Sequence, residues 1–321
     1  MQSFELLSRQ FAMRFEERHF PLRPATLYDP AEYFLGLGGK RIRPVLVLMG
    51  NELFGPLNED AYHAGTAIEL FHNFTLIHDD IMDQAPLRRG KETVHFKYGE
   101  NTAILAGDVM LVQAYEALSR IRGEALHPIM TLFNQTAREV CEGQQLDMDF
   151  EAMRSVALDA YLHMIELKTS VALAASLKMG AILGEASERN QNLLYEFGRK
   201  LGIAFQVQDD YLDAFGDPDK FGKQVGGDIL ANKKTFLLIH ALETASPDQR
   251  KRLQELLEGP VEGKVPKVLS IYRETGVDAW ALELKNRYLD EALTHLDDIA
   301  VLSRRKEPLQ ELARFLVGRD H

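Results

Sequence analysis

The sequence predicts an all-α fold. Apolar residues recur every three or four positions through most of the 321-residue chain, which is the spacing of an amphipathic helix. No segment shows a convincing two-residue alternation, so strands are not expected. Glycine and proline stand at breaks between the periodic segments, where they begin or end helices. These three observations favour a bundle of long helices.

The expected helices can be followed along the chain. Residues 59–83 would make about seven turns of helix. The pair Asp29-Pro30 is expected to precede one helix, and Gly55-Pro56 to follow another. Residues 216–227 form a glycine-rich polar loop, which we expect to act as a lid. Further helices are expected over residues 4–17, 102–121, 130–148, 160–183, 192–215, 235–242 and 280–302.

The chain reads as one domain over residues 1–321. No linker rich in serine, glycine or proline divides it. The long helices are apolar around much of their circumference, as helices are when they pack inside a large bundle. The sequence therefore predicts a single large helical bundle.

Composition excludes several classes of protein. The 37 Lys and Arg against 48 Asp and Glu give a net charge of −11, which argues against broad nucleic-acid binding. The longest stretch without a charged residue, 125–137, is too short to span a membrane. The single cysteine, Cys141, excludes an internal disulfide. Residues 1–23 contain three glutamates and no continuous apolar run, so we expect no targeting signal and a cytoplasmic protein.

Two acidic clusters share one pattern, D-D-x-x-D. The first is Asp79, Asp80 and Asp83, and the second is at 209–213. On a helix the first and last aspartates of each cluster differ by about 40° and lie one turn apart, whereas the middle one points about 100° away. Like charges stacked in this way are unfavourable unless a cation lies between them. Carboxylate oxygens suit Mg²⁺, so the pattern predicts magnesium sites.

Each acidic cluster is followed by a basic one. Arg88-Arg89-Gly90-Lys91 comes after the first, and Lys220, Lys223, Lys233 and Lys234 come after the second. Metal ions on one side and Lys or Arg on the other would hold a diphosphate. A third basic run, at 38–44, lacks the pattern of a P-loop and is expected to be a tight turn that presents two cations to phosphate. His72 is seven residues before Asp79 and projects on the same helix face.

With these residues the sequence resembles the trans-type isoprenyl diphosphate synthases of the polyprenyl synthetase family. The matching elements keep the family's order between residues 38 and 234. They are Gly-Gly-Lys-Arg-Ile-Arg-Pro at 38–44, His-Asp-Asp-Ile-Met-Asp at 78–83 with Arg88-Arg89-Gly90, Gly143-Gln144, Lys168-Thr169, and Phe-Gln-Val-Gln-Asp-Asp-Tyr-Leu-Asp at 205–213 followed by Gly216-Asp217-Pro218, Lys223, Gly227-Asp228 and Lys233-Lys234.

The resemblance implies a fold, a reaction and a set of roles. It implies long helices around a central catalytic cavity, a homodimer, and the condensation of isopentenyl diphosphate with an allylic diphosphate. Asp79, Asp83 and Asp209 would ligate Mg²⁺, three ions in the substrate complex, with Asp80, Asp210 and Asp213 supporting them. The remaining roles are Arg88, Lys168, Lys223 and Lys233 for the allylic diphosphate, Lys40, Arg43, His72 and Arg89 for isopentenyl diphosphate, and Thr169 and Gln206 beside the allylic cation. The loop at 223–228 is longer by one residue than in some members, which leaves the role of Asp228 open.

The resemblance also indicates a product length. In the family, two bulky residues just before the first acidic cluster stop growth at fifteen carbons, and one aromatic beside a small residue admits one more unit. Here the pair is Phe74 and Thr75. Helix geometry places Thr75 on the face of Asp79 and Phe74 about 140° from it. We expect geranylgeranyl diphosphate as the main product, with farnesyl or longer prenyl diphosphates as alternatives, and the helix with Val109 and Met110 as another source of the cavity floor.

Three other functions could use some of these residues. A class I terpene cyclase also has an aspartate-rich helix, but it usually pairs it with a different second motif and has no need of the basic turn at 38–44. A metal phosphohydrolase would use His78-Asp79 with His63 and His72, and it leaves the second acidic cluster unexplained. A non-catalytic partner subunit would be expected to have lost some of these residues, and all are present.

Overall fold

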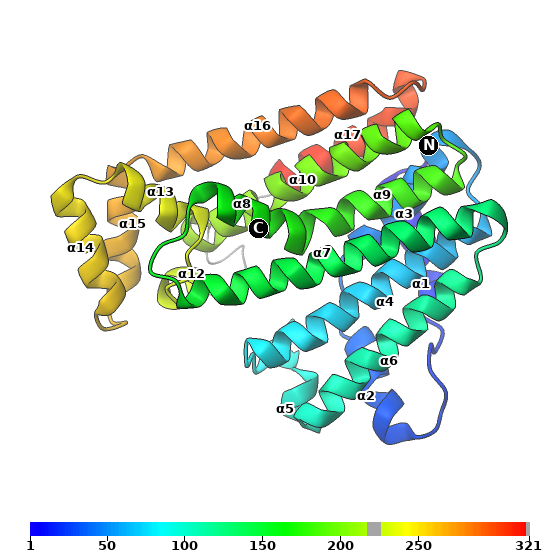
Figure 1. Ribbon diagram of the computed structural model, residues 1–321, viewed down its shortest axis with the longest axis horizontal. Coiled ribbons are helices and arrows are strands. Elements are labelled where there is room, and N and C mark those ends of the chain that lie inside the picture. Colours follow the sequence, from blue (N-terminus) through cyan, green and yellow to red (C-terminus); the bar gives the residue numbers. More distant parts are fainter. Residues whose placement is uncertain (217–225, 319–321) are drawn as a thin grey trace. The chain divides into compact units, whose positions relative to one another are not determined.

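The computed structural model describes residues 1–216 and 226–318, and it confirms the all-α prediction (Figure 1). The described strands are β1 (Leu87–Arg88) and β2 (Lys91–Glu92), an antiparallel pair in which Leu87 faces Glu92. The helices are α1 (Phe4–Phe15), α2 (Ala25–Leu35), α3 (Ile42–Phe54), α4 (Glu59–Met82), α5 (Val94–Tyr98), α6 (Glu100–Ser119), η1 (Gly123–Ala125), α7 (Leu126–Ala152), α8 (Leu158–Ile165), η2 (Glu166–Ser170), α9 (Val171–Leu183), α10 (Glu188–Phe215), α12 (Gly227–Leu230), α13 (Phe236–Thr244), α14 (Pro247–Glu258), α15 (Lys264–Glu274), α16 (Val277–Asp297) and α17 (Ser303–Gly318).

Three expected boundaries are wrong. Pro30 lies inside α2, which begins five residues earlier at Ala25, so the Asp29-Pro30 pair does not precede the helix. The single helix expected over residues 160–183 is divided by η2, a turn of π-helix. The helix expected at 280–302 ends at Asp297. Periodicity misses these features because a proline or a single wide turn hardly changes the apolar spacing.

The described residues group into two compact units, and the one-domain organisation stays a prediction. Unit 1 comprises Met1–Phe133, Ala175–Asn192 and Arg304–Pro308, and unit 2 comprises the other described residues. Within the part of the chain that the structure describes, no helix combines the length and the apolar character needed to cross a membrane.

Unit 1 is built around α4. This helix runs beside α6 and α3 (Figure 1), and its start is fixed by Asn58, whose side chain accepts a hydrogen bond from the Ala61 amide. The α3 residues Val45 to Met49 are fully buried. The backbone of α3 also meets that of α9, because a Cβ added at Gly180 would lie 2.1 Å from the Val47 carbonyl oxygen. α4 is thus held in a closely packed unit, and its carboxyl end carries Asp79, Asp80 and Asp83.

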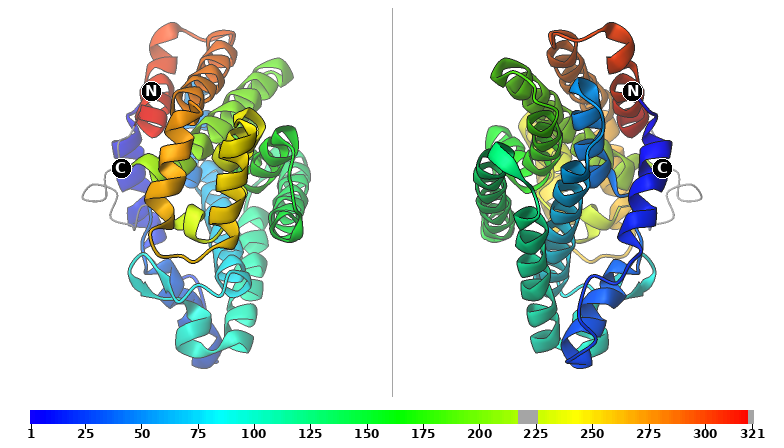
Figure 2. Two further views of the ribbon diagram at one scale, coloured as in Figure 1. Left: turned by 90° about the vertical axis from the view of Figure 1, so that its left-hand side faces the viewer. Right: turned by 90° about the vertical axis from the view of Figure 1, so that its right-hand side faces the viewer.

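Unit 2 has a separate apolar core. α13 packs against α8, α15 and α16, and its residues Phe236 to Ile239 are buried there with Tyr161 and Tyr272. α14 and α15 lie side by side, as Figure 2 (left) shows. α10 begins in unit 1 at Glu188, but its carboxyl end, with the second acidic cluster, belongs to unit 2.

Candidate active site

The first acidic cluster lies at the carboxyl end of α4. Asp80 is 1% exposed, and both of its carboxylate oxygens accept hydrogen bonds from Arg88 Nε at 2.9 Å, while Arg88 Nη2 lies 2.7 Å from Oδ1. Asp79 is partly exposed, and Asp83, which directly follows the last residue of α4, is exposed. The middle aspartate therefore binds a neighbour, as its direction on the helix predicts, and the other two face outward one turn apart.

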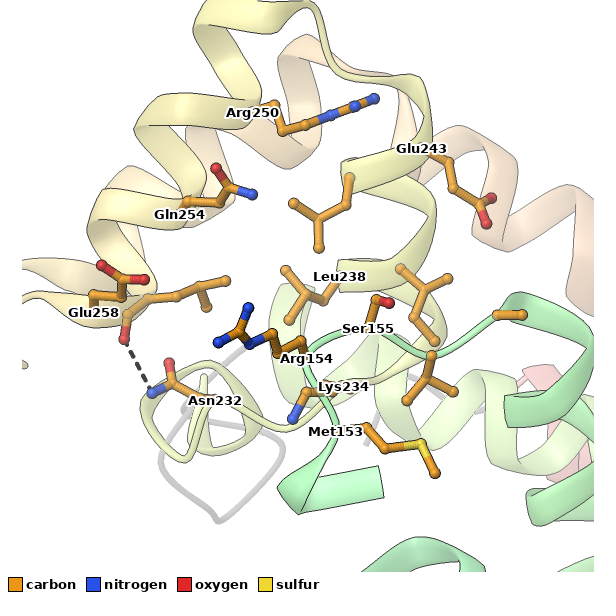
Figure 3. A pocket seen from close by; sticks show the side chains of 15 residues that line it. Met153, Arg154, Ser155, Asn232, Lys234, Leu238, Glu243, Arg250, Gln254 and Glu258 are labelled. Carbon is orange, nitrogen blue, oxygen red and sulfur yellow. Dashed lines mark hydrogen bonds between the residues drawn. The ribbon is translucent and has the colours of Figure 1, made fainter. Parts of the chain in front are cut away.

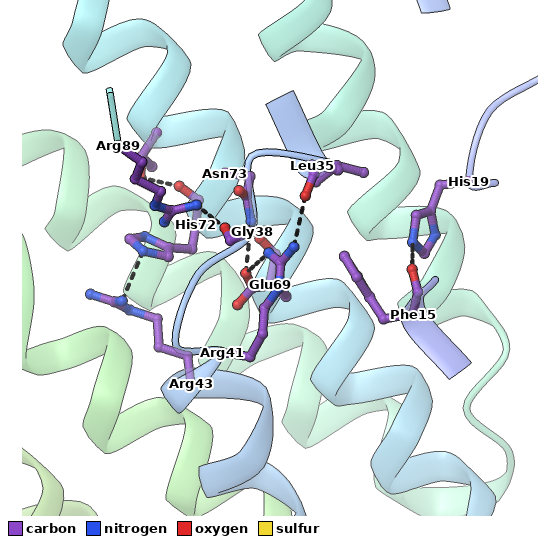
Figure 4. Close-up of polar contacts among 11 residues, drawn as sticks. Phe15, His19, Leu35, Gly38, Arg41, Arg43, Glu69, His72, Asn73 and Arg89 are labelled. Atoms are coloured by element: carbon purple, nitrogen blue, oxygen red, sulfur yellow. Dashed lines mark hydrogen bonds and ion pairs between the residues drawn. The ribbon is translucent and has the colours of Figure 1, made fainter. Parts of the chain in front are cut away.

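The basic run at 38–44 is a turn only as far as Arg41, because residues 42–44 already belong to α3, and it contacts α4 and the β1–β2 hairpin (Figure 4). Gly38 and Gly39 have φ of 80° and 145°, values that favour glycine. Arg89 Nη1 donates to the Gly38 carbonyl, and Arg43 Nη1 lies 2.9 Å from His72 Nε2. The turn thus brings together three of the residues predicted to bind isopentenyl diphosphate. The fourth, Lys40, is exposed.

The electrostatics of this cluster fit an anion. Burial lowers the pKa of Arg43 to about 10, because the buried guanidinium loses hydration. Burial, followed by Arg43 and Arg89, lowers the pKa of His72 well below 6.5. His72 is therefore neutral and accepts a hydrogen bond from Arg43. Excess positive charge concentrated in one place is stabilised by a phosphate group.

Arg41, in the same turn, is a structural residue. Its guanidinium donates to Glu69 and, at 2.8 Å, to the Leu35 carbonyl, and it lies over the ring of Phe15. Glu69 is buried and also accepts from Asn73 Nδ2 at 2.9 Å. Arg41 thus anchors the turn, while Lys40 and Arg43 on either side of it remain the candidates for phosphate binding.

The second acidic cluster lies at the carboxyl end of α10. Asp210 is 5% exposed and accepts from Tyr161 Oη at 2.7 Å and from Gln206 Nε2 at 2.9 Å. Asp213 Oδ2 accepts from the Asp228 amide at 3.0 Å. Asp209 is partly exposed. The middle aspartate is again the buried one, although here its donors are neutral rather than a guanidinium.

Two further carboxylates complete this cluster, Asp147, which the sequence did not single out, and Asp228. Asp147 Oδ2 lies 2.7 Å from Lys168 Nζ and 3.9 Å from Lys233 Nζ, so it holds the two predicted diphosphate ligands of unit 2 that the structure describes. Its position one turn after Gly143 is the only signal in the sequence that could have indicated it. Burial and then the negative charge of Asp210 raise the pKa of Asp228 to about 7, while the Lys233 ammonium acts in the opposite direction. This residue, whose role the sequence left open, is therefore part of the cluster.

Lys168 and Thr169 lie in η2. The Val171 amide donates to the Glu166 carbonyl, the i to i+5 bond of a π-helix, and such turns are common at functional sites. Thr169 Oγ1 lies 3.4 Å from Gln206 Oε1. The predicted catalytic group Lys168, Thr169 and Gln206 is therefore contiguous with Asp210 inside unit 2.

The donor sets fit magnesium. Among the residues described, no three His, Cys, Asp or Glu side chains gather closely enough to hold a metal by themselves. Mg²⁺ typically takes one or two carboxylates and completes its shell with water and phosphate oxygens. The outward aspartate pairs, Asp79 with Asp83 and Asp209 with Asp213, offer this kind of set. Burial also raises the pKa of Asp210, so a cation nearby would relieve the cost of its charge.

Two of the predicted lysines are not described, and the residues predicted to set product length lie in α4 and α6. Lys223 and Lys220, with most of the loop expected at 216–227, lie outside the described residues. Phe74 packs against Phe71 and His78, with ring centroids 5.9 and 4.8 Å apart, and Thr75 Oγ1 donates to the His72 carbonyl at 2.8 Å. The helix with Val109 and Met110 is α6.

Unit 2 also contains a cavity of about 1100 Å³ at α13 and α14 (Figure 3). Leucines such as Leu238 and Leu242 line it, together with the charged residues Arg154, Lys234, Arg250, Glu243 and Glu258. Lys234 belongs to the basic cluster predicted after the second acidic one, but none of the residues assigned a catalytic, metal or substrate role lies in the wall. We therefore assign the chemistry to the polar clusters and not to this cavity.

Comparison with known proteins shows the family of the chain. The polyprenyl synthetase family profile matches residues 24–275. The chain belongs to the polyprenyl synthetase family. A short chain isoprenyl diphosphate synthase of Methanocaldococcus jannaschii is 46% identical over 72% of this chain and 71% of its own length. A geranylgeranyl diphosphate synthase of Methanosarcina mazei is 38% identical over 93% of this chain and 91% of its own.

Solved structures give the same result. The crystal structure of a geranylgeranyl pyrophosphate synthase matches with a TM-score of 0.95 and 42% identity over 99% of both chains. The corresponding enzyme of Pyrococcus horikoshii matches with a TM-score of 0.92 and 35% identity over 98% of both chains. The predicted class, a prenyltransferase of isoprenoid synthesis, is confirmed.

Proposed function

We propose that this polyprenyl synthetase condenses isopentenyl diphosphate with allylic diphosphates, mainly to geranylgeranyl diphosphate. The observation that supports it best is that each unit holds an outward aspartate pair together with cations bound to a neighbouring carboxylate, Arg88 on Asp80 in unit 1 and Lys168 and Lys233 on Asp147 in unit 2. Relatives named geranylgeranyl diphosphate synthase are 37–39% identical over at least 92% of this chain.

In this proposal the two diphosphates have different ligands. Lys40, Arg43, His72 and Arg89 hold isopentenyl diphosphate, and Arg88, Lys168, Lys223 and Lys233 hold the allylic diphosphate. Asp79, Asp83 and Asp209 hold Mg²⁺, three ions in all, while Asp80, Asp210 and Asp213 support them. Bound Mg²⁺ supplies charge neutralisation to the departing diphosphate. A relative from Caulobacter crescentus has been solved with calcium and isoprenyl diphosphate.

The chain's own groups supply the rest of the catalysis. Lysine and arginine hydrogen bonds to the diphosphate strengthen as negative charge develops on it, which lowers the barrier to cleavage of the allylic C–O bond. The Thr169 hydroxyl and Gln206 amide oxygens stabilise positive charge on the allylic carbon. The double bond of isopentenyl diphosphate then forms the new C–C bond, and the released diphosphate takes a proton from the adjacent carbon, which restores a double bond.

A product assay tests the proposed function. Purified protein with Mg²⁺ is incubated with isopentenyl diphosphate and each of the five-, ten- and fifteen-carbon allylic diphosphates, and products are identified by mass. A twenty-carbon main product supports the proposal. A fifteen- or twenty-five-carbon product contradicts the assigned length; relatives named geranylfarnesyl diphosphate synthase are 33–34% identical. A protein that shows no turnover by itself but stimulates another synthase would be a partner subunit. A protein that forms a cyclic hydrocarbon would be a cyclase.

Product length should respond to Thr75. Thr75→Phe is expected to shorten the main product by one five-carbon unit, because the ring fills space on the Asp79 face of α4. Phe74→Ala is expected to lengthen it, because it opens a gap in the aromatic contacts with Phe71 and His78. Mass analysis of extracted products measures both. Thr75→Ser, which keeps the bond to the His72 carbonyl, is the control. Unchanged length in both variants would assign the floor to another helix, such as α6.

The two diphosphate sites should separate kinetically. Arg43→Ala is expected to raise KM for isopentenyl diphosphate about tenfold and Lys168→Ala to raise KM for the allylic diphosphate by a similar factor, because each removes a charged hydrogen bond. Steady-state kinetics with each substrate varied in turn measures both. Lys267→Ala, which removes an exposed cation of α15 outside the predicted basic clusters, is the control. Equal weakening of both substrates in both variants would contradict the division.

We further propose that the enzyme is a homodimer. α6 exposes apolar side chains, among them Leu105 (56%) and Val112 (65%), which are seven residues apart and share a helix face. Exposed apolar patches of this kind typically mark interfaces. Light scattering of the purified protein measures the mass, and a monomer would contradict the proposal. The cytoplasmic location stays a prediction from the sequence.

A further inference from the structure

The π-turn η2 is fixed in position by close backbone contact on two sides. A Cβ added at Gly143 of α7 would lie 2.4 Å from the Lys168 amide nitrogen, and one added at Gly202 of α10 would lie 2.6 Å from the Ser170 Cα. Distances this short mean that both helices touch the backbone of the turn. Glycine contacts of this kind bring helices together, but they carry no directional side-chain bond that would prevent the turn from rotating or sliding.

Side-chain contacts with α10 occur on both sides of the Gly202 contact. Before it, Arg199 Nη1 donates to Glu166 Oε1 at 2.9 Å, with the two side chains 28% and 24% exposed. After it, Thr169 Oγ1 and Gln206 Oε1 are 3.4 Å apart, near the outer limit of a hydrogen bond. The ion pair is therefore the stronger of the two contacts that set the position of the turn along α10.

A second partner of Arg199 makes the role of this pair testable. Arg199 Nη2 donates to Glu196 Oε2 at 2.6 Å, and Arg199 Nε donates to the same oxygen at 3.0 Å. Glu196 lies on α10 itself, three residues before Arg199, so this bond crosses to no other element. The same guanidinium thus makes two bonds to one carboxylate of its own helix and one bond to the turn that carries Lys168 and Thr169.

We propose that Glu166 and Arg199 form a positioning pair for the prenyl transfer. The pair holds η2 in the rotation and register that present the Lys168 ammonium and the Thr169 hydroxyl to the allylic diphosphate. Neither Glu166 nor Arg199 is among the proposed substrate ligands, and their effect is exerted through the turn. This role rests on the proposed function, because the proposed function is what assigns Lys168 and Thr169 to the allylic substrate.

The experiment compares Glu166→Gln with Glu196→Gln. Each removes one negative charge beside the same guanidinium, so their melting temperatures should fall by similar amounts. Glu166→Gln is expected to lower kcat ~10-fold or more, since small misplacements of catalytic groups have effects of this size, and to leave KM for isopentenyl diphosphate unchanged. Glu196→Gln should change kcat less than twofold. If the two variants had the same kcat, whether unchanged or lowered by the same factor, the proposal would be overturned.

Hydrogen exchange provides a readout that needs no turnover. In the protein without substrate, amides in a peptide covering residues 166–171 should exchange at least ~10-fold faster in Glu166→Gln than in Glu196→Gln, because the turn has lost a contact that holds it closed. Unchanged exchange would overturn the proposal even if activity falls. A wild-type chain that does not consume isopentenyl diphosphate would refute the proposed function instead, and the exchange result would still decide whether the pair fixes the turn.

A double variant checks that the two residues act as one unit. If they do, Glu166→Gln combined with Arg199→Met should lower kcat no further than Arg199→Met alone, since the bond is already broken. Independent, multiplying effects on kcat would mean that the residues act separately and would overturn the pairing. Arg199→Lys keeps the charge but loses the fork of donors and should give an intermediate kcat.

Discussion

Asp79→Ala and Asp209→Ala are each expected to lower kcat at least ~10²-fold, because each removes a proposed metal ligand that acts on the departing diphosphate. Both residues are partly exposed, whereas Asp80 and Asp210 are buried acceptors of protein hydrogen bonds. Folding should therefore survive the first two substitutions. Turnover at saturating substrates and Mg²⁺ measures the effect, and circular dichroism and the melting temperature verify the fold.

The control for this pair is Asp159→Ala. Asp159 is an exposed carboxylate at the start of α8, outside both acidic clusters, so its removal changes the net charge by the same amount. Its kcat should stay within about twofold of the wild type. If Asp79→Ala or Asp209→Ala stayed near wild-type turnover at saturating Mg²⁺, the corresponding cluster would not be a metal site. Loss in only one of the two would restrict the site to one unit.

Gly180→Ala should cause the largest loss of stability. The added Cβ would lie 2.1 Å from the Val47 carbonyl oxygen and 2.6 Å from the Asn51 amide nitrogen, both backbone atoms of α3. A backbone cannot turn aside as a side chain can, so the helices must separate within unit 1 and the packing of α3 is lost. We expect the free energy of unfolding to fall by about 3 kcal/mol or more. Urea denaturation measures it.

Gly318→Ala is the matched control. Gly318 is also helical, and a Cβ there meets no atom within 4 Å. In this position alanine should leave stability unchanged or raise it slightly, because it has the higher helix propensity. A Gly180→Ala protein as stable as the wild type would show that α3 and α9 can separate without cost. An equal loss in both variants would show that glycine itself, and not the helix crossing, is responsible.

Much of the fold and of the site could be predicted from sequence because the signals are local. The helix expected at 59–83 is α4, with its boundaries reproduced to within one residue, since Asn58 caps its start and apolar residues keep the helical spacing to its end. The directions of Asp80 and Asp210 followed from helix geometry alone. The sequence also distinguishes the apolar residues 45–49, which are buried in α3, from the polar turn that precedes them.

The remaining features depend on contacts that no local pattern encodes. Glu-Leu-Lys-Thr-Ser at 166–170 is compatible with an ordinary α-helix, and its π geometry occurs where Gly143 and Gly202 admit the neighbouring backbones. The ion pair of Asp147 with Lys168 joins α7 to that turn. α14 is mostly charged and polar, with Leu253 as its buried residue, so its periodicity was too weak to predict.

The π-turn also affects how related sequences should be aligned. In helical geometry each residue advances by about 100°, and a π-turn accommodates one residue more than the α-helix it interrupts. A homologue lacking one residue within 166–170 would therefore show only a single gap, in a segment that any secondary-structure pattern marks as helix. That gap would not be a shortened loop. It would turn the lysine-threonine pair to another face of the helix, so equivalence of these two residues must be judged from the length of this segment and not from their identity.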